Sequence, residues 1–158
     1  MLECSAQQTA RWEPSLKVRA YQKEDLDELI ALWRQCGLVA AQNNPIKDIE
    51  RKLEVDPDLF LVGVLDDSLV ASVMGGYEGH RGWINYLAVS TSVQGRGYGR
   101  EMMAIIEQKI RSRGCPKINL QVRSSNASVI AFYQALGYID DKVVGMGKRL
   151  ESDLEQSA

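Results

Sequence analysis

The first third of the chain begins with an alternating strand pattern and continues with two amphipathic helix patterns. Leu16–Tyr21 alternates apolar and polar residues, as a half-buried strand does. Lys23–Gly37 repeats its apolar residues at helical spacing, carries acids in its first turn and reaches a glycine at its end. A second helix is expected over Pro45–Asp58, because proline suits the first turn of a helix and Pro57 closes this one.

The middle of the chain reads as a hairpin followed by a central strand. Leu59–Tyr77 contains two apolar runs separated by a turn at Asp66–Ser68, and this short polar loop is typical of a β-hairpin. The next run, Trp83–Ser90, is almost continuously apolar. Such a run is expected of a strand that is covered on both faces in the middle of a sheet.

Helices and strands then alternate to the end of the domain. The pattern predicts a helix over Gly99–Gly114, a strand over Lys117–Val122, a helix over Asn126–Gly137 and a final strand over Lys142–Leu150. The crossover from Trp83 to Val122 would make its two strands parallel neighbours. The fold class is therefore α/β, with a mixed sheet of about six or seven strands and flanking helices.

Composition adds the domain limits and excludes several classes of function. The chain has 158 residues, 45% of them hydrophobic and 25% charged, which suits one globular domain. We assign that domain to residues 16–150, after a loose N-terminal extension (1–15) and before a polar C-terminal tail (151–158). A net charge of −2 gives no global reason to expect a nucleic-acid or membrane partner.

The number and spacing of cysteine and histidine residues argue against disulfide bonds and metal binding. The three cysteines form no C-x-x-C pair and His80 is the single histidine, so neither a disulfide scaffold nor a metal site is expected. No apolar run is long enough for a membrane span, and residues 1–15 lack the apolar middle of a secretory signal. These features favour a cytoplasmic protein.

A glycine-rich turn between the central strand and the next helix is the main candidate for binding chemistry. Glycines at 95, 97 and 99 leave backbone N–H groups uncovered at a helix start, where an anion binds, and Arg96 and Arg100 add positive charge. A P-loop would need lysine after its last glycine, whereas Arg100 and Glu101 follow Gly99. A dinucleotide-binding turn would need a third glycine at a different spacing, near the first strand.

Two motifs resemble those of the GNAT superfamily of N-acetyltransferases. Gln94–Gly99 is similar to the Q/R-x-x-G-x-G/A signature, and Ser124–Tyr138 is similar to the N-x-x-A-x-x-[FL]-Y-x-x-x-G-[FY] segment. The resemblance covers about Leu16–Leu150. Within the superfamily the chain looks like the small bacterial YpeA-type acetyltransferases, through "DLFLVGV", "SVMGGYEGHRG", "RGCPKINLQV" and the terminal "GKRL".

The resemblance implies the GNAT fold and transfer of the acetyl group of acetyl-CoA to a primary amine. It also implies the coenzyme contacts. Leu87, Ala88 and Val89 would bond the pantetheine arm as an added strand does. The glycine turn would hold the pyrophosphate through Gln94, Gly95, Arg96, Gly97, Tyr98, Gly99 and Arg100. Asn126 would either bond the coenzyme or only cap its own helix.

Tyr133 is the candidate general acid, because the family commonly places that acid on the helix after the asparagine. The alternative is that its ring only packs in the core. In the ribosomal-protein N-acetyltransferases a similar strand reads L-E-V-R and its glutamate is the base, but this chain has Gln121, which cannot accept a proton. Glu78 and His80, in a glycine-rich loop, are the remaining candidates for the base, beside a water relay or an already neutral amine.

The acceptor is left open by the sequence, as a protein N-terminus, a lysine side chain or a small amine. We expect direct attack in a ternary complex, because no strong covalent nucleophile has an obvious activating partner. A noncatalytic acyl-CoA-binding or sensing module and a nucleotide-binding domain are the rival functions. The chain could be a monomer or a homodimer, because an edge strand can pair across an interface or simply end the sheet.

Overall fold

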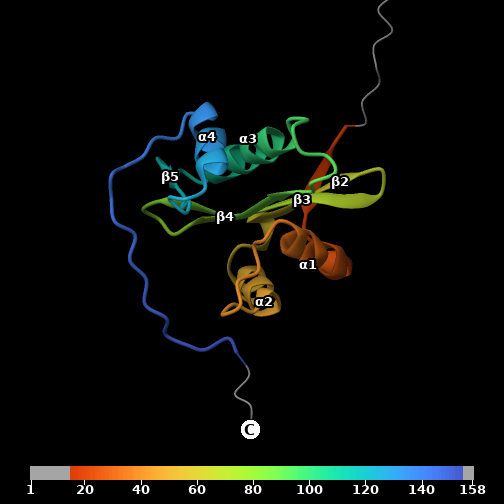
Figure 1. Ribbon diagram of the computed structural model, residues 1–158, viewed down its shortest axis with the longest axis horizontal. Coiled ribbons are helices and arrows are strands. Elements are labelled where there is room, and N and C mark those ends of the chain that lie inside the picture. Colours follow the sequence, from red (N-terminus) through yellow and green to blue (C-terminus); the bar gives the residue numbers. More distant parts are fainter. Residues whose placement is uncertain (1–14, 155–158) are drawn as a thin grey trace, which may run out of the picture.

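The fold is a mixed β-sheet with helices on both faces (Figure 1). The computed structural model describes residues 15–154. Its sheet has five strands in the order β1-β2-β3-β4-β5. The first four pair antiparallel and β5 pairs parallel with β4. Their bounds are Lys17–Ala20 (β1), Phe60–Leu65 (β2), Ser68–Tyr77 (β3), Gly82–Val89 (β4) and Ile118–Asn119 (β5).

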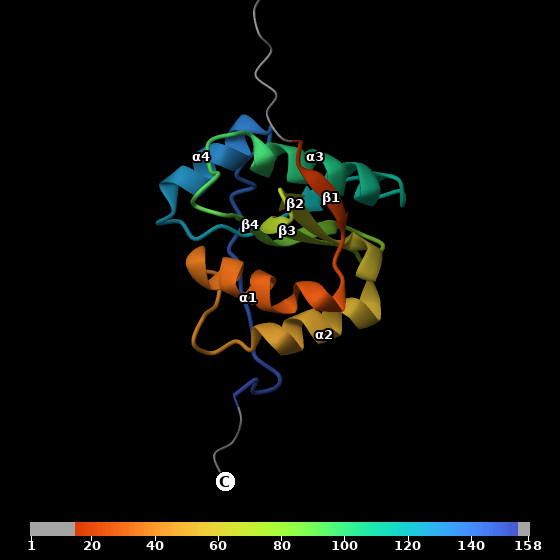
Figure 2. The ribbon, with the colours of Figure 1, turned by 90° about the vertical axis from the view of Figure 1, so that its right-hand side faces the viewer.

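Four α-helices form the two outer layers. Figure 2 shows α1 and α2 on one face of the sheet and α3 and α4 on the other. Short 3₁₀ turns, Lys23–Asp25 and Pro57–Leu59, precede α1 and β2. The helices are α1 (Leu26–Gln35), α2 (Pro45–Val55), α3 (Tyr98–Arg111) and α4 (Ala127–Ala135). The α/β fold class and the parallel crossover predicted from the sequence are thus confirmed.

Each face of the sheet has its own buried cluster. On the α3 side, Ile106 and Ile110 are fully buried against β3, and a Cβ on Gly75 would lie 2.7 Å from Ile106. On the α1 side, Trp33 and Phe60 are fully buried and their rings stack. Because α1 and α3 pack this tightly against β3, the strands between them are fixed in position.

The hairpin is also confirmed, with a tighter turn than the sequence suggests. Leu65 pairs directly with Ser68, so only Asp66 and Asp67 form the loop. Both have left-handed backbone conformations, with φ of 48° and 62°. This is the backbone that a two-residue hairpin loop requires, and aspartate tolerates it better than most residues do.

The expectation of six or seven strands is wrong for the part of the chain that the structure describes. Lys142–Leu150 forms no strand, because the backbone turns away just before it. Lys142 has a φ of 56°, and its backbone N–H donates to Asp140 Oδ1 at 2.8 Å. The segment then passes outside the sheet edge toward α2, as Figure 1 shows, and Met146 is 92% exposed. The predicted strand Lys117–Val122 is likewise reduced to β5.

The chain ends bear on the predicted domain limits. Residues 1–14 of the expected N-terminal extension lie outside the described residues. In the C-terminal tail, Arg51 of α2 donates to both carboxylate oxygens of Asp153, at 3.2 and 2.6 Å. This contact fixes the described end of the tail against α2. Within residues 15–154, no helix has the length and apolar character needed to cross a membrane.

Candidate active site

The strands β4 and β5 separate after two residues, which leaves one side of β4 unpaired. Their parallel pairing joins only Gly82 to Ile118 and Trp83 to Asn119. The rest of β4, including Leu87–Val89, has no β5 partner. An extended ligand that carries amide groups can pair with an open strand of this kind.

A glycine turn follows this open strand and leads into α3. The side chain of Gln94 donates to the carbonyl oxygen of Val89 at 2.9 Å, so the turn is tied back to the end of β4. Gly95 and Gly97 have φ of 79° and 87°, and a Cβ at either position would meet nothing within 4 Å. Gly97 is the N-cap of α3 and provides no side-chain cap. The positive end of a 14-residue helix therefore faces open space beside the two glycines.

The other residues of the turn have different surroundings. The side chains of Arg96 and Arg100 are exposed and form no hydrogen bond or ion pair with residues 15–154, so both remain available to an anion. Tyr98 is buried, and Gly99 packs against α4, where a Cβ would lie 3.2 Å from Phe132 Cζ. A phosphate group therefore fits at Gly95, Gly97 and the two arginines, whereas Gly99 serves helix packing.

Tyr133 lies on α4 and is 9% exposed. Its ring packs edge-on against Phe132 and Tyr138, with centroid distances of 5.1 and 5.6 Å. Burial raises the pKa of Tyr133 to about 12, so the phenol keeps its proton at neutral pH. Among the described residues its hydroxyl has no hydrogen-bond partner, whereas Tyr138 donates to Glu107 at 2.7 Å. Tyr133 therefore packs in the core, as the alternative reading of the sequence expects. Its role as the general acid stays a prediction.

Asn126 caps α4, which is one of the two roles expected for it. Its side-chain oxygen accepts from the backbone N–H of Val129 at 3.4 Å and from the Ser128 hydroxyl at 3.3 Å. Contact with a coenzyme stays a prediction.

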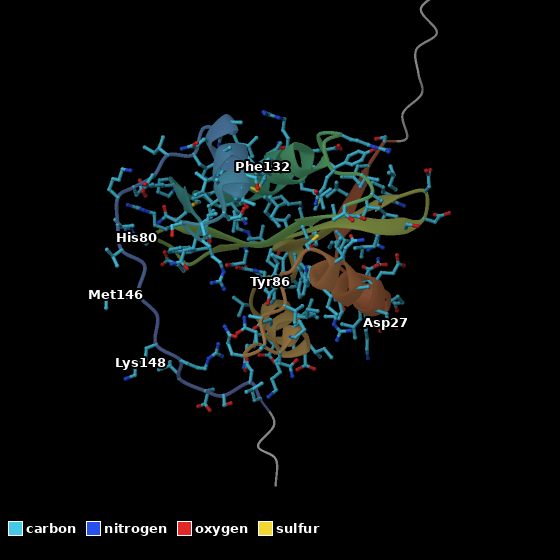
Figure 3. All side chains as sticks on the ribbon, in the orientation of Figure 1. Asp27, His80, Tyr86, Phe132, Met146 and Lys148 are labelled. Atoms are coloured by element: carbon cyan, nitrogen blue, oxygen red, sulfur yellow. The ribbon has the colours of Figure 1, made fainter. Side chains whose placement is uncertain are left out.

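A cavity of about 840 Å³ opens on the α2 side of the sheet. Glu78 and Gln121 line it, and His80 is not among its lining residues. The Glu78 carboxylate accepts from the backbone N–H of Arg81 at 2.5 Å, which closes the loop between β3 and β4. Figure 3 shows His80 at the edge of the molecule, well away from Tyr86. Of the two candidate bases from the sequence, Glu78 therefore lines the cavity and His80 does not.

A pair of residues that the sequence analysis missed joins the cavity to β4. The Tyr86 hydroxyl donates to Asp48 Oδ2 at 2.6 Å, and both residues line the cavity. Burial and, after it, the hydrogen bond to Asp48 raise the pKa of Tyr86 well above its ordinary value. Asp48 is on α2 and Tyr86 on β4, and nothing in their sequence spacing indicates this contact.

A β-bulge turns Tyr86 toward the cavity. Ser72 pairs with Ala88 and Met74 with Asn85, so Tyr86 and Leu87 together face one residue of β3. Tyr86 has a φ of 52°, which is costly for a residue that is not glycine. Three contacts hold it there: its ring stacks on Trp33 at 4.0 Å, its carbonyl accepts from the Ser72 hydroxyl at 3.0 Å, and its own hydroxyl binds Asp48.

Comparison with known proteins identifies the family. The acetyltransferase (GNAT) family profile matches residues 11–138. An acetyltransferase of Sodalis glossinidius is 46% identical over 141 residues, which cover 89% of this chain and 99% of that protein. An acetyltransferase of Yersinia pestis is 44% identical over 140 residues, with the same coverage of 89% and 99%. The chain therefore belongs to the GNAT acetyltransferase family.

Solved structures share the fold at low sequence identity. The aminoglycoside N-acetyltransferase AAC(6')-Iy, solved in complex with CoA, superposes with a TM-score of 0.68 at 17% identity, covering 87% of this chain and 97% of that one. The protein is thus a GNAT N-acetyltransferase, from a family that uses acetyl-CoA as its donor. This outcome sets aside the noncatalytic module and the nucleotide-binding domain considered from the sequence.

Proposed function

We propose that this enzyme transfers the acetyl group of acetyl-CoA to a primary amine by direct attack within a ternary complex. The observation that carries the proposal is that one strand borders both substrate regions. Leu87–Val89 is unpaired toward β5 and leads to the glycine turn. Tyr86, the residue before Leu87, lines the cavity on the α2 side of the sheet, whereas the glycine turn leads into α3 on the other face (Figure 2). The two substrates would therefore meet beside the β4 bulge.

The donor would lie along Leu87–Val89, with its pyrophosphate held by Gly95, Gly97, Arg96 and Arg100. Acetyl-CoA supplies the acetyl group and a thiolate leaving group. A backbone N–H of the Leu87–Val89 stretch would stabilise the oxyanion that forms when the amine nitrogen attacks the thioester carbonyl. Tyr133 would give its proton to the departing sulfur, and its pKa of about 12 means that it carries this proton at neutral pH.

The base that removes the amine's surplus proton is proposed among groups near the cavity. Glu78 is the candidate that lines the cavity, and His80 belongs to the same loop. Gln121 also lines it but has no basic site. An amine that enters neutral, or loses its proton to water, needs neither side chain.

Calorimetric titration and a turnover assay test the proposal in order. Acetyl-CoA should bind the purified protein, with ATP and NAD as controls that should not. Thiol release from acetyl-CoA should then increase on addition of primary amines such as n-butylamine and 1,4-diaminobutane. Binding of acetyl-CoA without amine-dependent thiol release from any primary amine tested would contradict an amine acceptor.

A further inference from the structure

Three carboxylates line the cavity, and two of them have partners that fix them. Asp56 binds the guanidinium of Arg113 at 2.5 Å and lies 3.9 Å from Lys52 Nζ. Glu78 is bonded to the loop backbone through Arg81. These two acids therefore neutralise a neighbouring cation or close a turn, whereas the third, Asp48, makes its shortest bond with a neutral hydroxyl.

The one cationic partner of Asp48 among the described residues is Arg51, whose Nη1 donates to Asp48 Oδ1 at 3.4 Å. Arg51 makes its shorter bonds with Asp153, at 2.6 and 3.2 Å, so its contact with Asp48 is the longer one. The short bond of Asp48 is the one from the neutral Tyr86 hydroxyl. Its side chain is 27% exposed to the cavity side. A carboxylate can accept about four hydrogen bonds, so the bonds from Tyr86 and Arg51 leave acceptor positions on Asp48 free.

The position of Asp48 relates it to the donor region. Tyr86 precedes Leu87 in β4, and its strained backbone is held by Trp33 and Ser72 as well as by Asp48. A costly conformation that is held from three directions indicates that the orientation of this ring is important. Tyr86 thus fixes a negative charge beside the strand where the acetyl group is expected.

The geometry points to Asp48 as the counter-ion that binds the ammonium group of the acceptor, with Tyr86 holding the carboxylate in place. The acceptor class is then an alkylamine that binds as its ammonium ion and gives its surplus proton to the base of the proposed function, or to water, before its nitrogen attacks. The inference rests on the proposed function and deepens it. Tyr86 and Trp83, which is 37% exposed, also offer aromatic rings to a cation in the cavity.

The other charges of the cavity fit this assignment. Lys52 donates to the carbonyl of Gly75 at 2.5 Å, and Arg51 is bound to Asp153. Arg123 comes from the chain after β5 and has no ion-pair partner within residues 15–154, so an anionic group of the acceptor could bind there. The site for a positive group remains at Asp48.

Two substitutions separate charge from structure. Asp48→Asn removes the charge but keeps an oxygen that can accept from the Tyr86 hydroxyl. Tyr86→Phe removes that hydrogen bond but keeps the Asp48 charge and the ring stacked on Trp33. Glu50→Gln is the matched control, because Glu50 is exposed on α2 and does not line the cavity.

The readout is the KM for n-butylamine and for 1,4-diaminobutane in a thiol-release assay at saturating acetyl-CoA. Asp48→Asn should raise the amine KM by about ten- to a hundredfold, as expected for loss of a charge-assisted hydrogen bond. The KM for acetyl-CoA and the unfolding temperature should stay near those of the wild type. Tyr86→Phe should have a smaller effect on the amine KM, and Glu50→Gln none.

An unchanged amine KM in Asp48→Asn, with loss of stability in Tyr86→Phe, would overturn the inference. The hydrogen bond between Asp48 and Tyr86 would then serve only to hold α2 against β4.

NMR titration with n-butylammonium, and with n-butanol as an uncharged control of similar size, separates the inference from the proposed function. Binding of the ammonium alone, lost in Asp48→Asn, supports the inference even if no amine is acetylated. Turnover that is insensitive to Asp48→Asn would refute the inference and keep the proposed function.

Discussion

The buried hydroxyl of Ser72 holds the β4 bulge, and its removal by Ser72→Ala tests how much the site depends on it. Ser72 is 0% exposed. It accepts from Trp33 Nε1 at 2.9 Å and donates to the Tyr86 carbonyl at 3.0 Å. Alanine fits the same space but leaves the indole N–H and the carbonyl without this partner.

The magnitude follows from those two groups. A buried donor or acceptor that loses its partner costs about 1–3 kcal/mol, so the two together should lower the free energy of unfolding by about 2–6 kcal/mol. For a protein of this size such a loss lowers the unfolding temperature by about 4–24 °C. The φ of 52° at Tyr86 stores strain, so a weakened bulge should also let the ring move away from Asp48.

Chemical denaturation and the thiol-release assay measure both effects on one variant. Ser72→Ala should lose stability and, at a temperature where it is still folded, acetylate amines more slowly than the wild type. Ser68→Ala, at the exposed start of the same strand, should change the free energy of unfolding by less than about 0.5 kcal/mol. If Ser72→Ala is as stable and as active as Ser68→Ala, the bulge does not depend on Ser72 and this reasoning is refuted.

Three further predictions concern the glycine turn, the acid and the pH dependence of stability. Gly97→Asp should weaken acetyl-CoA binding in calorimetry by more than tenfold, because it adds negative charge at the helix start. The neutral Gly97→Asn should weaken binding less. Equal losses of affinity in the two variants would argue against a phosphate at this position. Tyr133→Phe should lower kcat by about a hundredfold or more and leave acetyl-CoA affinity and stability nearly unchanged, so an unchanged kcat would exclude the acid role. The bidentate bond from Arg19, opposed in part by burial, lowers the pKa of Asp25 in the folded state. Asp25 therefore stabilises the fold fully above its unfolded value of about 4 and loses that contribution as the pH falls through its lower folded value. The stability difference between wild type and Asp25→Asn should accordingly be constant from pH 7 to about 5 and shrink below about 4; a constant difference to pH 2 would contradict this assignment.

The elements that the sequence predicted correctly are those whose pattern is set by burial. Trp83–Ser90 is apolar almost throughout, and the structure has β4 at Gly82–Val89. The apolar spacing after Gly99 corresponds to α3, whose Met102, Met103 and Ile106 are fully buried. Local signals also marked ends well, such as Pro45 at the start of α2 and Asn126 before α4.

The failures share a dependence on contacts between distant residues. The pattern of Lys142–Leu150 suits a strand, but a strand also needs a partner, and the turn at Asp140–Lys142 directs the chain away from β5. The bulge at Tyr86 likewise leaves no mark in an apolar run, because its cause is Ser72 and Trp33 on other elements. Asp48 reads as one more charge on an amphipathic helix until the fold brings it to Tyr86.

The two motifs that carried the family resemblance meet at one packing contact. Gly99, the last glycine of the turn, lies against Phe132 of the second motif so closely that a Cβ would be 3.2 Å from the ring. The start of α3 is thereby fixed relative to α4, and Tyr133, the next residue after Phe132, is fixed with it. A larger residue at 99 would separate the helices and so shift the candidate acid relative to the glycine turn. The small residue at this position is therefore best explained by how it places Tyr133, and the uncovered glycines at 95 and 97 by the phosphate that we propose they bind.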